Sequence, residues 1–252
     1  GVVTIDTNGL DSDVKKPGRR QKVATKESDV ENVPPAENAQ KTQVATTTPT
    51  YVKSEAILNT IAPGKTLDYG AGRGKGSEAI NATSYEPFPI DSFDPDYTDS
   101  SDIANESFEK IISPSVLNVV PKDVRDNIVL DIGRILKQEG AAIITARSVN
   151  DVKKAKFKKE HSSEPNAFVV GQTASEATFQ KGFTQQELSS YAKDLLGEGF
   201  EVTAIPKIEG KPAPSGIGIL IKKKKGRFQK AIPNMASSFS GIRTVEAALE
   251  MD

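Results

Sequence analysis

The apolar positions between residues 51 and 222 of this chain follow two patterns. Short continuous apolar runs bounded by Gly, Pro or Asp are typical of buried strands. Stretches in which apolar side chains recur every three or four positions indicate amphipathic helices. The runs predict strands over residues 66–69, 89–93, 108–113, 141–145, 200–205 and 216–221. The helical spacing predicts helices over residues 51–61, 77–82, 121–137 and 184–196.

Local signals mark the ends of the two longest helices. Pro121 suits the first turn of the helix over residues 121–137, and Gly140 is expected to stop it. Thr184 followed by Glu187 predicts a capping box at the start of the last helix. These signals strengthen the helix predictions on both sides of the strand over 141–145.

Strands that alternate with helices predict an α/β domain with a parallel sheet and helices on both faces. The last two strands have no helix between them, so they are expected to form an antiparallel pair at one edge. We expect this Rossmann-like domain to span residues 50–225. A low-complexity arm, residues 1–49, and a C-terminal tail, residues 226–252, are expected to be disordered or extended.

Composition removes several kinds of chemistry. The chain has no cysteine, which excludes disulfides, thiol nucleophiles and Cys-based zinc sites. It has one histidine, His161, so we expect neither a metal site nor histidine-based catalysis. No run of apolar residues is long enough to span a bilayer, and no secretory leader is visible after Gly1. Cytoplasmic localisation is therefore expected.

A glycine-rich turn follows the first predicted strand. Asp68 stands two residues before Gly70, and Gly72 and Gly74 follow at alternate positions. Glycines here permit a sharp turn and let a ligand approach the backbone. A carboxylate so close to the turn repels phosphate but accepts hydrogen bonds from an ammonium group. The pattern favours a cofactor with an amino-acid part over a nicotinamide dinucleotide; the alternative is a turn that serves packing alone.

This turn resembles the first motif of class I S-adenosylmethionine-dependent methyltransferases, and the resemblance extends over roughly residues 51–222. It implies a seven-stranded sheet with an antiparallel terminal strand, and S-adenosylmethionine as cofactor. The glycine turn would lie against the amino-acid half of the cofactor. Asp94, after the second predicted strand, would hold the ribose hydroxyls, and Asp102 would contact the adenine.

Two further stretches resemble uncharacterised methyltransferase-like proteins of tailed bacteriophages. They are residues 116–120, Val-Leu-Asn-Val-Val, and residues 178–183, Thr-Phe-Gln-Lys-Gly-Phe. This likeness implies a setting in the host cytoplasm or in a virion. The alternative function is that of a non-catalytic methyltransferase-like module in a large assembly. In that case the N-terminal arm would contact the other proteins of the assembly.

The methyl acceptor is expected near Ser113, Ser115 and Asn118, which follow the strand over residues 108–113. Amino-methylating DNA enzymes carry a polar residue, two prolines and an aromatic residue at this place. Here Ser113 and Pro114 fit, but the second proline and the aromatic residue are missing. The alternative is that Ser113–Ser115 form a strand-terminating turn and that Asn118 makes an ordinary polar contact.

Basic residues gather in three places, although the net charge of the chain is −1. They occur in the N-terminal arm, in the polar connection over residues 148–182, and in the tail (Lys15, Lys16, Arg19, Arg20 and Lys22; Lys153, Lys154, Lys156, Lys158 and Lys159; Lys222–Lys225, Arg227 and Lys230). The run in the arm is either a solvated linker or a contact with a nucleic acid or another partner, and the run in the connection is either solvated or a contact with nucleic-acid phosphates. The run in the tail either contacts a nucleic acid or protects the edge strand. No membrane partner is expected.

Overall fold

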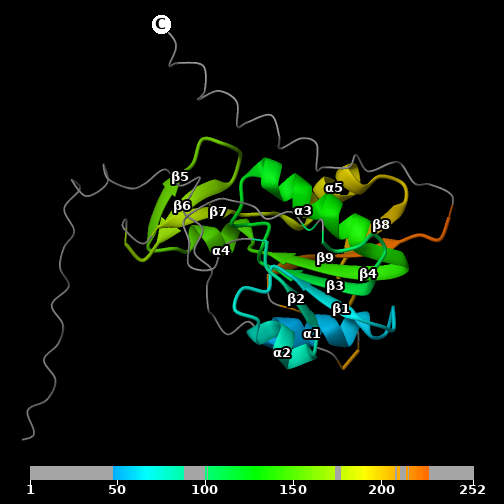
Figure 1. Ribbon diagram of the computed structural model, residues 1–252. Coiled ribbons are helices and arrows are strands. Elements are labelled where there is room, and N and C mark those ends of the chain that lie inside the picture. The colour runs from blue at the N-terminus through cyan, green and yellow to red at the C-terminus, as the bar shows by residue number, and fades with distance from the viewer. Residues whose placement is uncertain are drawn as a thin grey trace, which may run out of the picture.

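The computed structural model describes residues 48–87, 100, 102–173, 177–207, 209–210, 214 and 216–226 (Figure 1). Its helices are α1 (Thr48–Leu58), α2 (Lys75–Ile80), α3 (Lys122–Ile135), α4 (Val149–Lys153) and α5 (Gln185–Leu196). Its strands are β1 (Thr66–Tyr69), β2 (Thr83–Tyr85), β3 (Phe108–Pro114), β4 (Leu136–Ala146), β5 (Phe157–Glu160), β6 (Ala167–Gly171), β7 (Thr178–Lys181), β8 (Phe200–Ala204) and β9 (Ile217–Lys223). None of the described helices combines the length and apolarity needed to cross a membrane.

The main sheet has six strands in the order β2-β1-β3-β4-β9-β8. Strands β2, β1, β3 and β4 run parallel, and β9 runs antiparallel to both β4 and β8. The antiparallel terminal pair predicted from the missing helix is thus confirmed. Among the described residues the sheet has six strands, and the expected count of seven is not reached. The second strand is β2, Thr83–Tyr85; residues 89–93, where a strand was expected, lie outside the described part.

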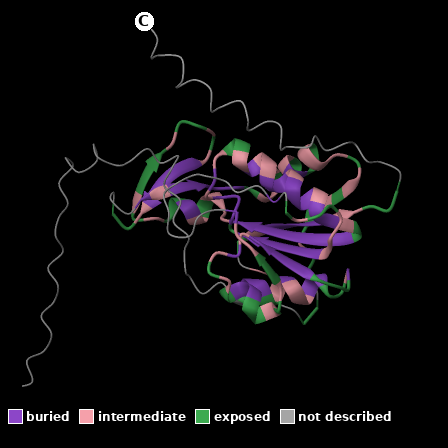
Figure 2. Cartoon of the chain, in the orientation of Figure 1, coloured by how far each residue is buried: buried purple, intermediate pink, exposed green. Residues whose placement is uncertain are grey.

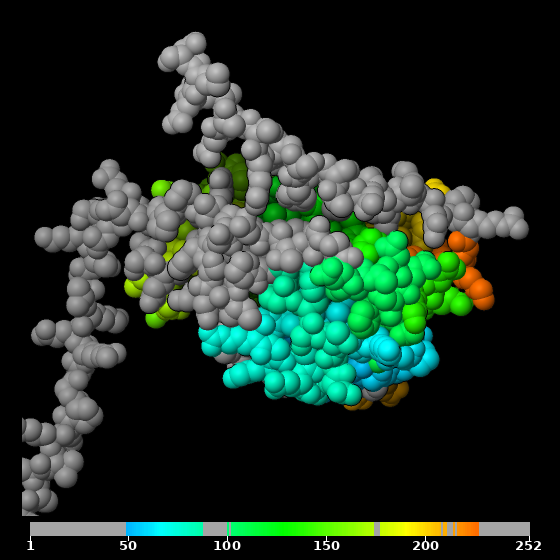
Figure 3. All heavy atoms as spheres, in the orientation of Figure 1, coloured from blue at the N-terminus to red at the C-terminus, as the bar shows by residue number. Residues whose placement is uncertain are grey.

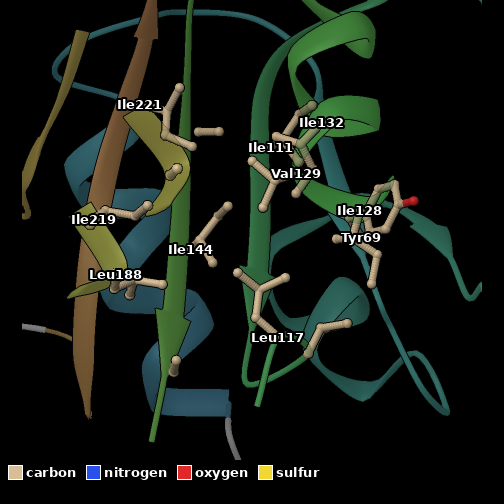
Figure 4. Close-up of a cluster of buried hydrophobic side chains, with 14 of the residues drawn as sticks. Tyr69, Ile111, Leu117, Ile128, Val129, Ile132, Ile144, Leu188, Ile219 and Ile221 are labelled. Atoms are coloured by element: carbon tan, nitrogen blue, oxygen red, sulfur yellow. The ribbon is translucent and has the colours of Figure 1, made fainter. Parts of the chain in front are cut away.

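Helices cover both faces of this sheet, α1 and α2 one face and α3 and α5 the other (Figure 1). The strands alternate their side chains between two buried clusters, because successive residues of a strand point to opposite faces. Ile111 and Ile144 pack with Ile132 of α3 on one side, in the cluster that Figure 4 shows. Ile112 and Ile143 pack against α1 on the other. Figure 2 shows that the carboxyl-terminal halves of the central strands β3 and β4 are buried.

The longest departure from the sequence prediction lies between β4 and α5. Residues 148–182, here called the insertion, were expected to be a polar connection, but they form α4 and a separate antiparallel sheet in the order β5-β6-β7. Two small apolar clusters hold it together. One joins Val169 to Phe179, and the other places Phe168 against Val152 of α4. Each strand has only four or five residues, which explains why the apolar pattern was too weak to predict.

Arg125 of α3 fastens the insertion to the main domain. Its guanidinium is buried and makes two hydrogen bonds to the carboxylate of Glu164, at 2.7 and 2.9 Å. The same side chain donates to the carbonyl oxygens of Leu117 and Val120 in the loop after β3. A planar guanidinium that is paired in this way fixes both position and orientation. The insertion and the loop after β3 are therefore held against each other.

Replacement of Glu164 by Ala would leave the buried Arg125 without its carboxylate. We expect Glu164→Ala to lower the free energy of unfolding by about 3 kcal/mol, because an uncompensated buried charge is costly. Chemical denaturation measures this change. Glu160→Ala, an exposed acid of the same insertion, is the matched control and should change stability by less than about 0.5 kcal/mol. Equal effects of the two variants would contradict the anchoring role of Arg125.

Candidate functional site

The candidate site lies at the carboxyl end of β1, where Asp68 points away from solvent. Asp68 is fully buried, and one carboxylate oxygen accepts a hydrogen bond of 2.6 Å from the hydroxyl of Ser77 in α2. The other oxygen, Oδ1, has no well-formed hydrogen bond among the described residues. The phenol of Tyr51 in α1 lies beside the carboxylate. A buried carboxylate with one unsatisfied oxygen is costly, so its presence suggests a ligand-binding role.

Burial is the main cause that raises the pKa of Asp68 to about 7. The Ser77 and Tyr51 hydroxyls act in the opposite direction, and the nearby negative charge of Glu86 raises the pKa further. Burial and the charge of Asp68 also raise the pKa of Tyr51. The native structure thus holds Asp68 in an environment that favours a proton, or a cation, on its carboxylate.

The glycine turn between β1 and α2 requires glycine for two reasons. Gly70, Gly72 and Gly74 all have positive φ angles, of 88°, 56° and 75°. A Cβ on Gly70 would also stand 2.2 Å from Cγ2 of Val116, in the loop after β3. The turn therefore fixes the end of β1 directly against the loop after β3, with no room for a side chain between them.

Three backbone amides of this turn, those of Gly70, Ala71 and Gly72, are already occupied. Gly70 and Ala71 donate to the carbonyl oxygen of Tyr85, at 2.8 and 3.0 Å, and Gly72 donates to the carboxylate of Glu86. A turn that cradles phosphate needs such amides free for the ligand. The arrangement is therefore unsuited to a pyrophosphate, in agreement with the inference from Asp68 and its spacing to the glycines.

Glu86 is the acid that directly follows the second strand, and the sequence analysis missed it. The sequence analysis expected the acid after the second strand to be Asp94, which lies outside the described residues. The sequence analysis placed the second strand at residues 89–93, which also lie outside the described residues. The short run Thr83-Ser84-Tyr85, with its β-branched and aromatic residues, was the signal that β2 comes earlier. Ser77 and Tyr51, the neighbours of Asp68, were also not predicted.

Asp102 is exposed in a turn that precedes β3. The carbonyl oxygen of its neighbour Ile103 accepts a hydrogen bond from Arg134, in the last turn of α3. No interaction between described residues joins Asp102 to Asp68 or to the glycine turn. Its role toward a cofactor stays a prediction.

The three acceptor-site candidates differ sharply in their surroundings. Ser113, at the end of β3, is buried and its hydroxyl has no partner among the described residues. Asn118 is buried too; its amide nitrogen donates to Gln180 of the insertion at 2.9 Å, and its oxygen is unpartnered there. Ser115 has an exposed side chain and a φ of 60°, and its backbone amide donates to Thr145. Ser113 and Asn118 thus carry unused hydrogen-bonding capacity, whereas Ser115 serves the turn.

Within the described residues, no group of three or more His, Asp or Glu side chains is arranged to hold a metal ion. His161 lies in the insertion, where its ring stacks edge-on to Phe179 at 5.4 Å and its Nδ1 bonds to the Ser163 hydroxyl. This histidine contributes to the packing of the small sheet.

Comparison with known proteins finds no matching family model and no matching curated sequence. Solved structures with a similar arrangement include S-adenosylmethionine-dependent methyltransferases. A Burkholderia thailandensis 1,6-didemethyltoxoflavin-N1-methyltransferase with bound S-adenosylhomocysteine is 14% identical, with 69% of this chain and 78% of that chain covered and a TM-score of 0.44. A Clostridium acetobutylicum methyltransferase is 13% identical, with coverages of 69% and 92% and a TM-score of 0.46.

A Streptoalloteichus sugar N-methyltransferase is 9% identical, with coverages of 84% and 98% and a TM-score of 0.49. Similarities at this level are too distant to define the function of the chain, which has to be argued from its own residues. The resemblance to tailed-bacteriophage proteins, and the virion setting it implied, find no support in these comparisons.

The raised pKa of Asp68 gives a pH dependence with a definite sign. The unfolded carboxyl ionises near pH 3.8, whereas the native one keeps its proton up to about pH 7. Because the native state then holds more protons, its stability falls as the pH rises between these values. The loss attributable to this group is about 4 kcal/mol. We expect Asp68→Asn to remove this loss, so that the variant exceeds the wild type in stability at pH 8.

Denaturant titrations of both proteins at pH 4, 6 and 8 measure this effect. The exposed Asp194→Asn variant, which changes the same charge on α5, should follow the wild type at every pH. An Asp68→Asn variant whose stability curve runs parallel to that of the wild type would show that Asp68 has an ordinary pKa.

The contact between Gly70 and Val116 predicts a second effect. Gly70→Ala should lower the free energy of unfolding by about 2–4 kcal/mol, from overpacking and from strain at positive φ. Gly197→Ala is the control for strain alone, since Gly197 has a φ of 71° and open space around its Cβ position. The double variant Gly70→Ala/Val116→Ala should recover part of the loss. Equal destabilisation at Gly70 and Gly197, measured by thermal unfolding, would disprove the close contact.

Proposed function

We propose that this chain is an S-adenosylmethionine-dependent methyltransferase, and that Asp68 is the residue on which cofactor binding depends. The observation that carries the proposal is a buried carboxylate whose Oδ1 has no hydrogen-bond partner among the described residues, beside a turn in which the amides of Gly70, Ala71 and Gly72 are already used. The ammonium group of an amino-acid moiety supplies the missing hydrogen-bond donor and the missing positive charge together. A phosphate-bearing cofactor supplies neither.

The acid that follows β2 completes the proposed cofactor site. Glu86 accepts from the Gly72 amide and its charge acts on both Asp68 and Tyr51, so the two carboxylates belong to one electrostatic unit. A carboxylate here is suited to accept hydrogen bonds from the two hydroxyls of a ribose, as dinucleotide folds do with an acid at the corresponding place. We therefore assign the ribose to Glu86. Asp94, outside the described residues, stays the alternative.

The bound cofactor supplies an activated methyl group on a sulfonium sulfur. The protein then has to bring a nucleophilic atom of the acceptor into line with that methyl group, so most of the rate enhancement is expected from proximity and orientation. In this proposal Ser113 and Asn118 orient the acceptor, because both carry buried polar atoms that find no partner within the described part of the chain. Many acceptors need no dedicated base, and the scarcity of histidine is compatible with such a reaction.

Calorimetric titration with S-adenosylmethionine and S-adenosylhomocysteine tests the proposal. We expect micromolar binding to the wild type, and binding at least tenfold weaker to Asp68→Asn and Glu86→Gln, since each loses a charge-assisted contact. Asp194→Asn, an exposed acid on α5, should bind as the wild type does. Absence of binding to the wild type would refute the function and favour a non-catalytic module of this fold.

The same titration reports on the protonation of Asp68. A cation beside the carboxylate lowers its pKa, so cofactor binding near pH 7 should release about half a proton per site. Titrations in buffers of different ionisation enthalpy measure this number. The Asp68→Asn variant should release no proton on cofactor binding. This comparison separates the contribution of the Asp68 carboxyl from that of other ionisable groups.

A further inference from the structure

The outer edge of the insertion carries a concentration of lysines with few acids to balance them. They lie on α4, on the connection that follows it and on β5, and all are exposed; we call them the lysine patch (Lys153, Lys154, Lys156, Lys158 and Lys159). Two acids lie in the same stretch, Asp151 and Glu160, and Asp151 is already paired with Lys154 at 3.1 Å. Ser148 and the charges of Lys154 and Arg147 hold the pKa of Asp151 below its usual range. The local charge is therefore clearly positive.

One contact between α4 and β5 brings two members of the lysine patch together. The Nζ of Lys158 donates to the carbonyl oxygen of Lys153 at 3.1 Å, which brings the two segments together. Lys153 itself lies over the ring of Phe168, 5.8 Å from its centre. Lys156 and Lys159 have no ion pair among the described residues. Lys158 and Lys159 are successive residues of β5 and therefore project to opposite faces of the small sheet, so the patch wraps around its edge strand.

The lysine patch begins near the carboxyl edge of the main sheet, which also carries the candidate site. Contacts with the main domain hold the insertion that carries the patch in place. Helix α4 begins three residues after the carboxyl end of β4. The backbone amide of Lys181 donates to the carbonyl oxygen of Asn118 at 2.7 Å, and the ion pair between Arg125 and Glu164 closes the other side. Figure 3 shows the insertion and the region of α2 and β2 at the surface of the same side of the molecule.

The surroundings of the patch favour a polyanion in water over a membrane. Binding to a lipid surface needs apolar side chains that enter the bilayer beside the basic ones. The large apolar residues of the insertion are turned into its two clusters, and the one exposed large apolar residue of the described part, Val52, lies in α1. A row of lysines without apolar anchors matches the sequence-independent contacts that proteins make with phosphates.

We infer that the lysine patch binds the phosphate backbone of a nucleic acid and presents it to the methyl-transfer site at the carboxyl edge of the sheet. The inference rests on the proposed function for the second half of this statement; the binding itself does not depend on it. It assigns the methyl acceptor to the class of nucleic acids and gives the insertion a function.

The test uses the full chain and short fluorescent oligonucleotides, single-stranded and duplex, in a series of salt concentrations. We expect binding that weakens steeply with salt. The triple variant Lys156→Ala/Lys158→Ala/Lys159→Ala should bind about tenfold more weakly, and its log–log salt slope should be smaller by about two to three. The matched control is Lys65→Ala/Lys193→Ala/Lys207→Ala, which removes the same charge from exposed positions elsewhere. This control should keep the slope of the wild type.

Equal affinity and slope in the two triple variants would overturn the inference, as would failure of the wild type to bind any oligonucleotide at low salt. Stronger patch-dependent binding to vesicles that contain phosphatidylglycerol than to oligonucleotides would overturn it in favour of a lipid surface. Calorimetry with S-adenosylmethionine separates the two proposals. The lysine variant should bind cofactor normally, and Asp68→Asn should bind oligonucleotides normally. If the wild type does not bind S-adenosylmethionine, the proposed function fails, but the evidence that the lysine patch binds oligonucleotides is unaffected.

Discussion

The burial of the Asp68 carboxylate is the constraint around which this structure is organised. To keep that group out of solvent, the fold brings the hydroxyls of Ser77 from α2 and Tyr51 from α1 to it, so two helices are tied to the end of one strand. The arrangement leaves one oxygen unsatisfied and keeps the pKa of the carboxyl near neutrality. Such a group is unfavourable for stability alone. Under the proposed function, the binding of a positively charged group beside the carboxylate would offset this cost.

The features that the sequence predicted well are those whose local signal and tertiary environment agree. The start of α3 after Pro121 and the capping box of Thr184 and Glu187 lie where the apolar spacing and the local signals indicated. The glycine turn after β1 is equally local, because positive φ angles at Gly70, Gly72 and Gly74 demand glycine whatever surrounds them. Apolar periodicity and turn chemistry act over a few residues, so a single sequence contains them.

Other features depend on contacts that no local pattern contains. Gly140 was expected to stop α3, but the helix ends at Ile135 and Gly140 lies in β4. It is glycine because a Cβ would stand 2.8 Å from the carbonyl oxygens of Glu109 and Lys137. Strand β2 is short and half exposed, and the insertion is built from strands of similar length, so neither gives a clear alternation. The position of Glu86 in the site depends on where β2 ends, and the anchoring role of Arg125 depends on its pairing with Glu164, which is distant in the sequence.

The loop that follows β3 touches both functional regions within three residues. Val116 lies against Gly70 in the glycine turn, and Asn118 bonds to Gln180 and to the backbone of Lys181 in the insertion. Such a short, buried segment has little freedom to move one end without the other. A displacement of the small sheet is therefore expected to displace the turn after β1 as well, through residues 116–118. The geometry of the turn after β1 and the position of the small sheet are thus set by the same three residues.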